Sequence, residues 1–343
     1  MSEEGKAPAS TAPRARHLAL GLEPERLLTM YRQMVLARAL DRRAWTLNRQ
    51  GQAPFVISCQ GHEAAQVAAA AALRPGIDWV VPYYRDLALC LAMGMTAREF
   101  MLSVLARADD PGSGGRQMPS HFSLRRARIV TVSSTVATQV VHAAGIAYAS
   151  RLRDLDEVTI TTLGEGSTSC GDWHEALNFA GVHRLPLICL VEDNGYAISV
   201  PRTLQMPVAS VAERARGYGM AAADVDGGDP LAVYEVISQA VRRARAGEGP
   251  TLVRARCWRI TSHSSDDDQR RYRPPEELEE MLRSDPIDRF RAHLLEEGLL
   301  TEEAEERLQR ECAAEVDAAV AAAEAAPLPD PADLERHVYA AEG

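Results

Sequence analysis

The sequence predicts an α/β protein built on a parallel, doubly wound sheet flanked by helices, with helical extensions at both ends. Apolar, strand-like runs at 158–163, 187–191, 221–225 and 251–255 alternate with segments of helical character. Strands that alternate with helices are typical of a parallel sheet whose crossover helices cover its faces. The chain has 343 residues, of which 46% are hydrophobic, enough for one large domain of this kind or two modest ones.

Three helices are expected before the first of these strands. Residues 24–50 carry apolar side chains on one stripe, as an amphipathic helix does. A second helix is expected over 62–73, ending before Pro75. A third is expected to begin after Thr96, because threonine is a favoured N-cap.

Four further segments complete the predicted element order. Residues 109–123 are rich in glycine and proline, and such a long loop is expected to be functional. Residues 137–150 predict a helix whose small side chains suit a buried or intersubunit position. The segment 230–246 predicts the helix between the last two strands, and 276–325 is charged and helical.

Composition excludes several classes of function. A net charge of −10 argues against general nucleic-acid binding. No apolar run approaches the roughly 18 residues of a membrane span, and residues 1–22 lack the apolar core of a secretion signal. Six scattered cysteines without a C-x-x-C motif predict reduced, buried thiols in a cytoplasmic protein.

Two polar residues each follow an apolar, strand-like run in a loop that contains glycine. Glu165 lies in a Gly-Glu-Gly loop after the run 158–163, and Asn194 follows 187–191, 29 positions later. The carboxyl ends of parallel strands are where open sheets bind ligands. A carboxylate and an amide oxygen at this edge suit a hard divalent cation that also holds phosphate oxygens.

The glycine-rich loop 164–172 departs from two other phosphate-binding motifs. A dinucleotide fingerprint needs G-x-G-x-x-G, and the third glycine comes too late here. A P-loop needs a lysine where this chain has Asp172. Asn194 and Gly195 alone could form a simple turn, so the prediction of a metal site depends on the two loops together.

The segment 164–199 resembles the motif of thiamine-diphosphate enzymes, in which a G-[DE]-G loop is followed, one strand later, by an Asn-containing turn. The resemblance implies that Mg²⁺ is bound by Glu165, by the Asn194 side chain and by the carbonyl of Tyr196. The metal then bridges the diphosphate of the cofactor. Other residues expected at the cofactor in the first loop are Gly164, Gly166 and Ser167.

The resemblance extends over about residues 25–300 to the alpha subunit of the decarboxylating component of 2-oxo acid dehydrogenase complexes. It implies a thiamine-diphosphate-binding fold. Tyr84 and Arg85 match a pair that grips the diphosphate, a role that suits the planar guanidinium. Ser134 and Val136 lie in a segment that reaches the aminopyrimidine ring through backbone groups.

Two more loops match this family. Residues 115–121 are similar to its loop ahead of the cofactor site, and 263–268 to its late His-Ser loop at the active-site entrance. His263 then corresponds to a catalytic histidine that stabilises intermediates and assists acyl transfer to lipoamide. An imidazole can exchange protons near neutral pH, so this role is chemically reasonable.

The pattern favours the branched-chain members of the family, with residues 54–58, 195–199 and the Asp-rich late loop as the evidence. The expected reaction is oxidative decarboxylation of a branched-chain 2-oxo acid, with acyl transfer to the lipoyl-bearing acyltransferase core. One alternative is a pyruvate or acetoin dehydrogenase alpha subunit. Another is a silent assembly subunit, against which the intact Glu165, Asn194, Arg85 and His263 argue.

The resemblance also implies a partner. The glutamate that activates the cofactor comes from a beta subunit in this family, so an α₂β₂ heterotetramer is expected. Within the chain we expect a flexible tail at 1–22, the α/β domain that binds the diphosphate at 23–275, and a helical extension at 276–343. We do not expect Ser264 and Ser265 to be phosphorylated, although kinases act there on some relatives.

Two departures from the family pattern concern acidic residues. Glu165 stands where many thiamine enzymes have aspartate, so the extra methylene must be accommodated. Glu192 and Asp193 place two acids beside the metal turn, where some relatives have basic or amide side chains. A carboxylate facing diphosphate is unfavourable, so Glu192 is expected to point away or to pair with a cation.

Overall fold

A five-stranded parallel sheet lies at the centre of the computed structural model, which describes residues 16–336 and 338–339. The strand order is β1-β2-β3-β7-β6, and every pairing is parallel. The four predicted strands are confirmed. β1 was missed because a run of three residues carries no alternation to detect. The strands are β1 (Trp79–Val81), β2 (Thr159–Gly164), β3 (Leu187–Asp193), β6 (Ala221–Asp226) and β7 (Thr251–Arg256).

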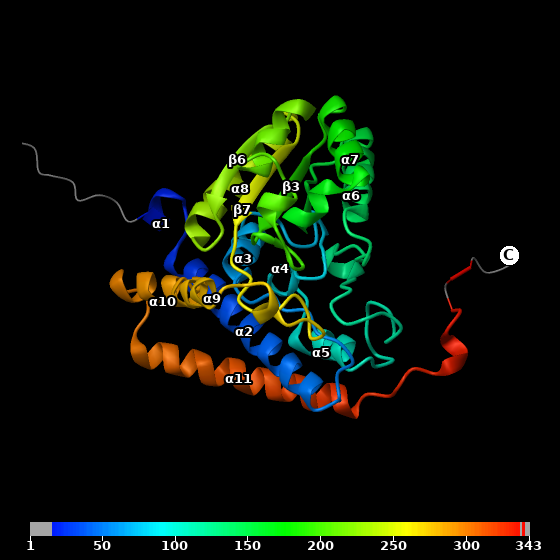
Figure 1. The fold of residues 1–343 in the computed structure, drawn as a ribbon, viewed down its shortest axis with the longest axis vertical. Coiled ribbons are helices and arrows are strands. Elements are labelled where there is room, and N and C mark those ends of the chain that lie inside the picture. Colours follow the sequence, from blue (N-terminus) through cyan, green and yellow to red (C-terminus); the bar gives the residue numbers. More distant parts are fainter. Residues whose placement is uncertain (1–15, 337, 340–343) are drawn as a thin grey trace, which may run out of the picture.

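Helices cover both faces of this sheet, so the doubly wound architecture is confirmed (Figure 1). Ile188 and Leu190 of β3 join the core formed with α2, α3 and α8, whereas Cys189 and Val191 join the core formed with α6 and α7. Alternate residues of this strand thus pack against the helices on opposite faces of the sheet. These helices are α2 (Pro24–Arg49), α3 (Glu63–Ala71), α6 (Thr138–Leu152), α7 (Gly171–Val182) and α8 (Pro230–Arg245).

The helical predictions before β2 hold with small differences at their ends. Two short helices, α4 (Leu87–Ala92) and α5 (Ala97–Val104), follow α3. Thr96 caps α5 as expected, and Glu99 completes a capping box with it. α4 was missed, since six uniformly apolar residues show no helical periodicity. Residues 109–123 form turns and irregular backbone without a helix or strand.

The C-terminal helical segment consists of three helices, α9 (Pro275–Arg283), α10 (Pro286–Glu296) and α11 (Glu302–Ala325). Figure 1 shows α11 lying alongside α2 and reaching α5. Phe290 of α10 and Val316 of α11 belong to the same hydrophobic core as α2 and α3. The expected boundary after residue 275 therefore does not separate two cores.

The predicted flexible tail at 1–22 is wrong for its last seven residues. Arg16–Ala19 form a short helix, α1, in which His17 is buried, and Leu22 belongs to the core. Arg16 also forms an ion pair with Asp229 at 2.6 Å. These contacts hold the segment against α8, and residues 1–15 lie outside the described part of the chain.

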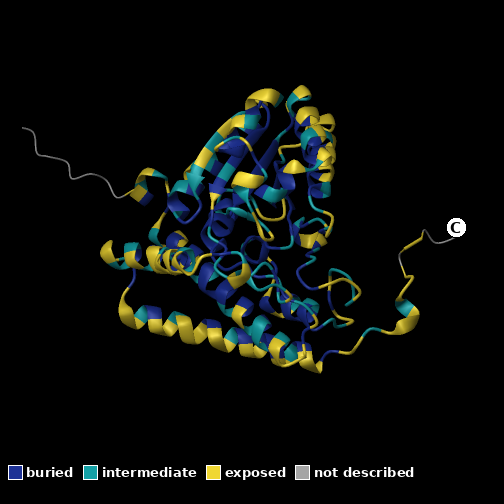
Figure 2. Ribbon diagram, in the orientation of Figure 1, coloured by how far each residue is buried: buried dark blue, intermediate teal, exposed yellow. Residues whose placement is uncertain are grey.

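Burial follows the layers of the fold, with the sheet enclosed and the outer helix faces exposed (Figure 2). All six cysteines are free thiols, and five of them are buried, as predicted. Among the described helices, none is both long and apolar enough to cross a membrane.

Candidate active site

The two predicted loops meet at the carboxyl edge of the sheet. Glu165 begins a 3₁₀ segment (Glu165–Ser169) directly after β2, and Asn194 directly follows β3. The register pairs Gly164 with Glu192, so both strands end at the same height. The backbone N–H of Asn194 donates a hydrogen bond of 3.1 Å to Oε2 of Glu165. The β-α-β geometry therefore brings the two candidate ligands together.

Glu165 has a buried oxygen that is free for a ligand. The residue is fully buried, and its Oε1 has no hydrogen-bond partner among the described residues. Burial, followed by the negative charge of Asp193, raises the pKa of Glu165 to about 7. A buried carboxylate is costly unless a cation or hydrogen bonds compensate it. The free oxygen thus fits a bound cation.

The side chain of Asn194 is held by two contacts. Its Oδ1 accepts a 3.3 Å hydrogen bond from the backbone N–H of Tyr196, and its amide nitrogen lies 3.3 Å from Nε2 of His62. His62 is fully buried, and burial, then Arg85, lowers the pKa of its imidazole well below the usual value. A neutral His62 can accept a hydrogen bond from the Asn194 amide N–H at Nε2. The sequence analysis missed this residue.

A cavity of about 320 Å³ opens at this edge of the sheet and brings all the predicted site residues together. Three further residues complete its wall: Tyr83, Ala197 and Ile198. The predicted residues in the wall are Tyr84, Arg85, Ser134, Val136, Gly164, Glu165, Gly166, Ser167, Asn194, Tyr196 and His263. They come from five separate stretches of the chain.

Arg85 brings an uncompensated positive charge to the cavity. It is 2% exposed and forms no ion pair with a carboxylate of the described residues. Its guanidinium donates to the carbonyl of Ser58, approaches Nδ1 of His263 at 3.4 Å and lies 5.7 Å from the centre of the Tyr84 ring. Its Nε has no hydrogen-bond partner among the described residues. A buried cation with a free donor fits an anionic ligand.

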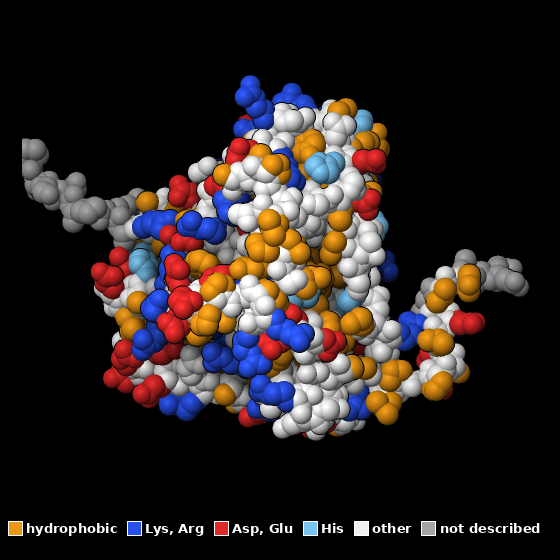
Figure 3. Space-filling model, in the orientation of Figure 1, with side chains coloured by type: hydrophobic (Ala, Val, Ile, Leu, Met, Phe, Trp, Pro, Cys, Tyr) orange, Lys and Arg blue, Asp and Glu red, His pale blue; other side chains and the backbone are white. Residues whose placement is uncertain are grey.

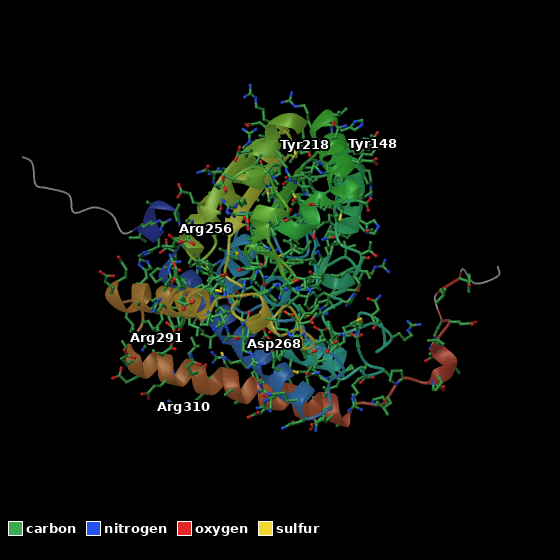
Figure 4. The ribbon with its side chains drawn as sticks, viewed as in Figure 1. Tyr148, Tyr218, Arg256, Asp268, Arg291 and Arg310 are labelled. Atoms are coloured by element: carbon green, nitrogen blue, oxygen red, sulfur yellow. The ribbon has the colours of Figure 1, made fainter. Side chains whose placement is uncertain are left out.

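His263 presents a neutral imidazole to the same cavity. Burial, then Arg85 and Arg259, lowers the pKa of His263 to about 3. The backbone N–H of His263 donates a 2.8 Å hydrogen bond to Asp267, which also accepts from the Tyr272 hydroxyl. The late loop is thereby closed on itself. Figure 4 labels Asp268 of this loop near the middle of the view.

Gly166 allows the two glycine-containing loops to touch. A Cβ atom on Gly166 would lie 2.7 Å from the Cβ of Ala197, which belongs to a two-stranded ribbon of β4 (Tyr196–Ala197) and β5 (Val200–Pro201). That distance is too short for two carbon atoms without movement. Close packing against Ala197 therefore requires a glycine at position 166, in addition to the place of this residue in the motif.

The predicted 115–121 loop contacts a residue that lines the cavity. His121 of the predicted 115–121 loop forms a hydrogen bond through Nε2 with the hydroxyl of Ser134. Gln139, in the first turn of α6, donates a 3.1 Å hydrogen bond to the carbonyl of Thr162 in β2. These contacts fix the segment that carries Ser134 and Val136 beside the ends of the strands.

Glu192 does not line the cavity, in agreement with the first of its two expected arrangements. Its Oε2 accepts 3.0 Å hydrogen bonds from Gln66 Nε2 and from the Tyr83 hydroxyl. The expected cation pair is absent for Glu192 among the described residues. It occurs at Asp193 instead, which pairs with Arg202 at 2.7 Å and Arg254 at 2.6 Å.

The donor set suits Mg²⁺ held together with phosphate. No three His, Cys, Asp or Glu side chains of the described residues gather into a metal site of their own. The cavity offers the free Oε1 of Glu165, the side-chain oxygen of Asn194 and the carbonyl of Tyr196. Mg²⁺ commonly takes one or two protein oxygens, together with phosphate oxygens and water. The residues therefore fit a metal–diphosphate group.

Comparison with known proteins shows which family the chain resembles over most of its length. Residues 31–332 match the family described as "Dehydrogenase E1 component". The chain is 52% identical over 325 residues to 2-oxoisovalerate dehydrogenase subunit alpha of Bacillus subtilis, covering 95% of this chain and 98% of that protein. It is 40% identical over 301 residues to 3-methyl-2-oxobutanoate dehydrogenase subunit alpha of Mycobacterium tuberculosis, covering 88% and 79%. The human mitochondrial 2-oxoisovalerate dehydrogenase subunit alpha is 37% identical over 319 residues, covering 93% and 71%.

Proposed function

The chain belongs to the dehydrogenase E1 component family, and from this premise we propose that it is the alpha subunit of a branched-chain 2-oxo acid dehydrogenase. The observation that carries the proposal is the single cavity lined by Glu165, Asn194, Arg85 and His263. Relatives named for 2-oxoisovalerate or 3-methyl-2-oxobutanoate support the branched-chain substrate. The reaction is decarboxylation of the 2-oxo acid with transfer of the acyl group to lipoamide, whose disulfide is reduced and so acts as the oxidant.

Thiamine diphosphate, when bound, supplies the electron sink for loss of carbon dioxide. Glu165, Asn194 and the Tyr196 carbonyl would hold Mg²⁺, and the metal would neutralise the diphosphate. Arg85 would bind the diphosphate oxygens, because its charge has no carboxylate partner among the described residues and its guanidinium is buried. The backbone of the segment around Ser134 and Val136 would orient the aminopyrimidine ring.

His263 is the residue that can accept and return a proton. Its imidazole lines the cavity and is neutral because burial and Arg85 oppose its charge. A negative charge that approaches the ring in the cavity, such as a thiolate, would favour the protonated form, so the pKa of His263 would then rise. Arg85, 3.4 Å away, orients the ring.

Activation of the cofactor requires a second polypeptide in this proposal. Glu165 is the one carboxylate among the cavity-lining residues that the structure describes, and in this proposal it would hold the metal. A carboxylate for the aminopyrimidine would then come from a beta subunit, in an α₂β₂ heterotetramer. The lipoyl-bearing acyltransferase core would receive the acyl group. A cytoplasmic location stays a prediction that cell fractionation can test.

The decisive experiment is decarboxylation after coexpression with the beta subunit. The assay compares 3-methyl-2-oxobutanoate with pyruvate, each with and without thiamine diphosphate and Mg²⁺. A preference for the branched acid that disappears without cofactor supports the proposal. A preference for pyruvate keeps the site and mechanism but moves the chain to the alternative substrate class. Turnover by the isolated chain would contradict the need for a partner.

A further inference from the structure

A second, open groove of about 500 Å³ lies beside the active-site cavity. One wall is the C-terminal half of α2, which contributes Arg42, Trp45 and Arg49. The other wall is formed by residues on either side of the late loop and by Gln60 in the segment before α3. The remaining lining residues are Thr46, Gln60, Ile260, Thr261, Ser262 and Gln269. None of these residues has a role in the proposed chemistry.

The groove is positively charged on a protein that is acidic as a whole. Its lining includes two arginines and no acidic residue, although the chain carries a net charge of −10. Arg42 and Arg49 are exposed, and neither forms an ion pair with a carboxylate of the described residues. Among the described residues, the one hydrogen bond of the Arg49 guanidinium goes to the Thr46 hydroxyl, at 3.4 Å. Both charges are therefore available to a partner.

The three aspartates of the late loop leave this charge uncompensated. Asp267 accepts hydrogen bonds from the His263 backbone and the Tyr272 hydroxyl, and Asp268 pairs with Arg270 at 2.8 Å. Neither they nor Asp266 lines the groove. Figure 3 shows basic side chains gathered in the lower middle of this face, where the late loop crosses α2.

The groove shares a wall with the active-site cavity. Ser262 lines the groove, and the next residue, His263, lines the cavity. The wall is firm, because the Ile260 backbone donates a 3.2 Å hydrogen bond to Gln60, and Gln269 donates a 3.0 Å bond to the Ile260 carbonyl. A molecule seated in the groove would therefore lie directly beside the residue that meets the acyl acceptor.

We propose that this groove docks an acidic protein domain that carries the lipoyl arm, an inference that rests on the proposed function. Arg42 and Arg49 are seven positions apart on one helix, which separates them by about 10 Å along its axis. A single phosphate cannot engage both, whereas two carboxylates on a folded surface can. Trp45 lies between them in sequence and offers an apolar contact area.

The test uses the assembled enzyme with the double variant Arg42→Glu/Arg49→Glu. A matched control, Arg242→Glu/Arg307→Glu, makes the same charge change at exposed arginines of α8 and α11 that have no ion pair with the described residues. Three quantities are measured: affinity for the isolated lipoyl domain, KM for that domain, and decarboxylation with ferricyanide as acceptor. The third does not involve the lipoyl domain.

We expect the KM and the dissociation constant for the lipoyl domain to rise by about tenfold or more in the groove variant. This rise should be smaller at high salt, since exposed charges are screened. The control variant should keep the wild-type KM and dissociation constant, and both variants should keep the wild-type rate with ferricyanide. An unchanged KM overturns the proposal, as does an equal loss with free lipoamide. Loss of the beta subunit on gel filtration would make the groove a subunit interface instead. Failure of wild-type enzyme with ferricyanide would count against the proposed function, while the binding measurement still tests the groove.

Discussion

The backbone N–H of Asn194 donates a hydrogen bond to the carboxylate of Glu165 across 3.1 Å, although the residues are 29 positions apart. The bond occupies Oε2 and leaves Oε1, buried and unpartnered, for a cation. Parallel register between β2 and β3 places the two loops at one height, so the contact follows from the sheet itself. This relationship makes each loop depend on the other.

Replacement of Glu165 by glutamine should abolish metal-dependent cofactor binding. Glutamine keeps the size of the side chain, and its oxygen can still accept from the Asn194 backbone, but the negative charge is lost. We expect Mg²⁺-dependent affinity for thiamine diphosphate to fall at least about 100-fold, the upper end of what loss of an outer-shell partner costs. Calorimetric titration of the assembled enzyme measures it.

The matched control for this substitution is Glu235→Gln on the exposed face of α8. It makes the same chemical change away from the cavity, and cofactor affinity should match that of the wild type. If Glu165→Gln also binds the cofactor normally with Mg²⁺, the carboxylate is not a metal ligand.

Replacement of Gly166 by alanine should push the two loops apart. The new Cβ would lie 2.7 Å from the Cβ of Ala197 and 3.3 Å from its Cα, so the turn that carries Tyr196 must move. Cofactor affinity should fall by roughly tenfold, equivalent to about 1.4 kcal/mol. The double variant Gly166→Ala/Ala197→Gly removes the closer clash and should recover part of that loss. Gly171→Ala, with nothing within 4 Å of its Cβ, is the control.

Replacement of Arg85 by lysine should weaken recognition of the diphosphate specifically. Lysine keeps the charge but loses the planar fork and the contact with the Ser58 carbonyl. We expect affinity for thiamine diphosphate to fall by about tenfold or more. Competition with thiamine, which has no phosphate, checks the assignment. A similar loss for thiamine and its diphosphate would show that Arg85 supports the cavity as a whole.

Much of this site could be predicted from local sequence, because each motif lies at the end of an element with a clear pattern. Glu165 and Asn194 could be identified because each lies in a glycine-containing loop after an apolar run. Parallel strands end at the same edge of a sheet, so the two residues were expected to lie close together. Residues such as Ala197 and Ile198 were missed because a short ribbon positions them, and no periodicity marks two-residue strands.

His62 shows why the remainder could not be predicted. Its neighbours in sequence give no sign of a partner, and it approaches Asn194 from 132 positions away. Glu192 shows the same limit. Of the two adjacent acids, Asp193 faces Arg254 of β7 and Arg202 after β5 and forms ion pairs with both. Glu192 points to the other face of the strand and forms none with the described residues, and the sequence alone does not show which of the two acids meets the arginines. Packing between neighbouring strands decides which side chain meets which partner, and the sequence of one segment does not contain that information.

The pH dependence of stability should show that the pKa of His263 is lowered in the folded protein. Its folded-state pKa of about 3 lies below the ordinary value of 6.5, so the unfolded chain binds the extra proton. The contribution of the neutral His263 to the free energy of unfolding is therefore lost as pH falls below 6.5. Compared with His263→Asn, the cofactor-free wild type should lose about 1 kcal/mol between pH 7.5 and 5.5, after allowance for partial exposure. Thermal midpoints at both pH values measure the difference. Equal shifts in the two proteins would mean that His263 titrates normally.

Asp41 should give a pH dependence of the opposite sign. Its carboxylate is fully buried and accepts 2.7 Å hydrogen bonds from the Ser58 hydroxyl and the Cys59 backbone, yet burial raises the pKa to about 6 from 3.8. The folded state therefore holds the proton more tightly. Its stabilising contribution is complete below pH 3.8 and is lost as pH rises through 6. Between pH 7.5 and 5 the wild type should gain about 1.4 kcal/mol relative to Asp41→Asn. Urea unfolding at the two pH values tests this, and a constant difference between the proteins would show that Asp41 stays ionised throughout.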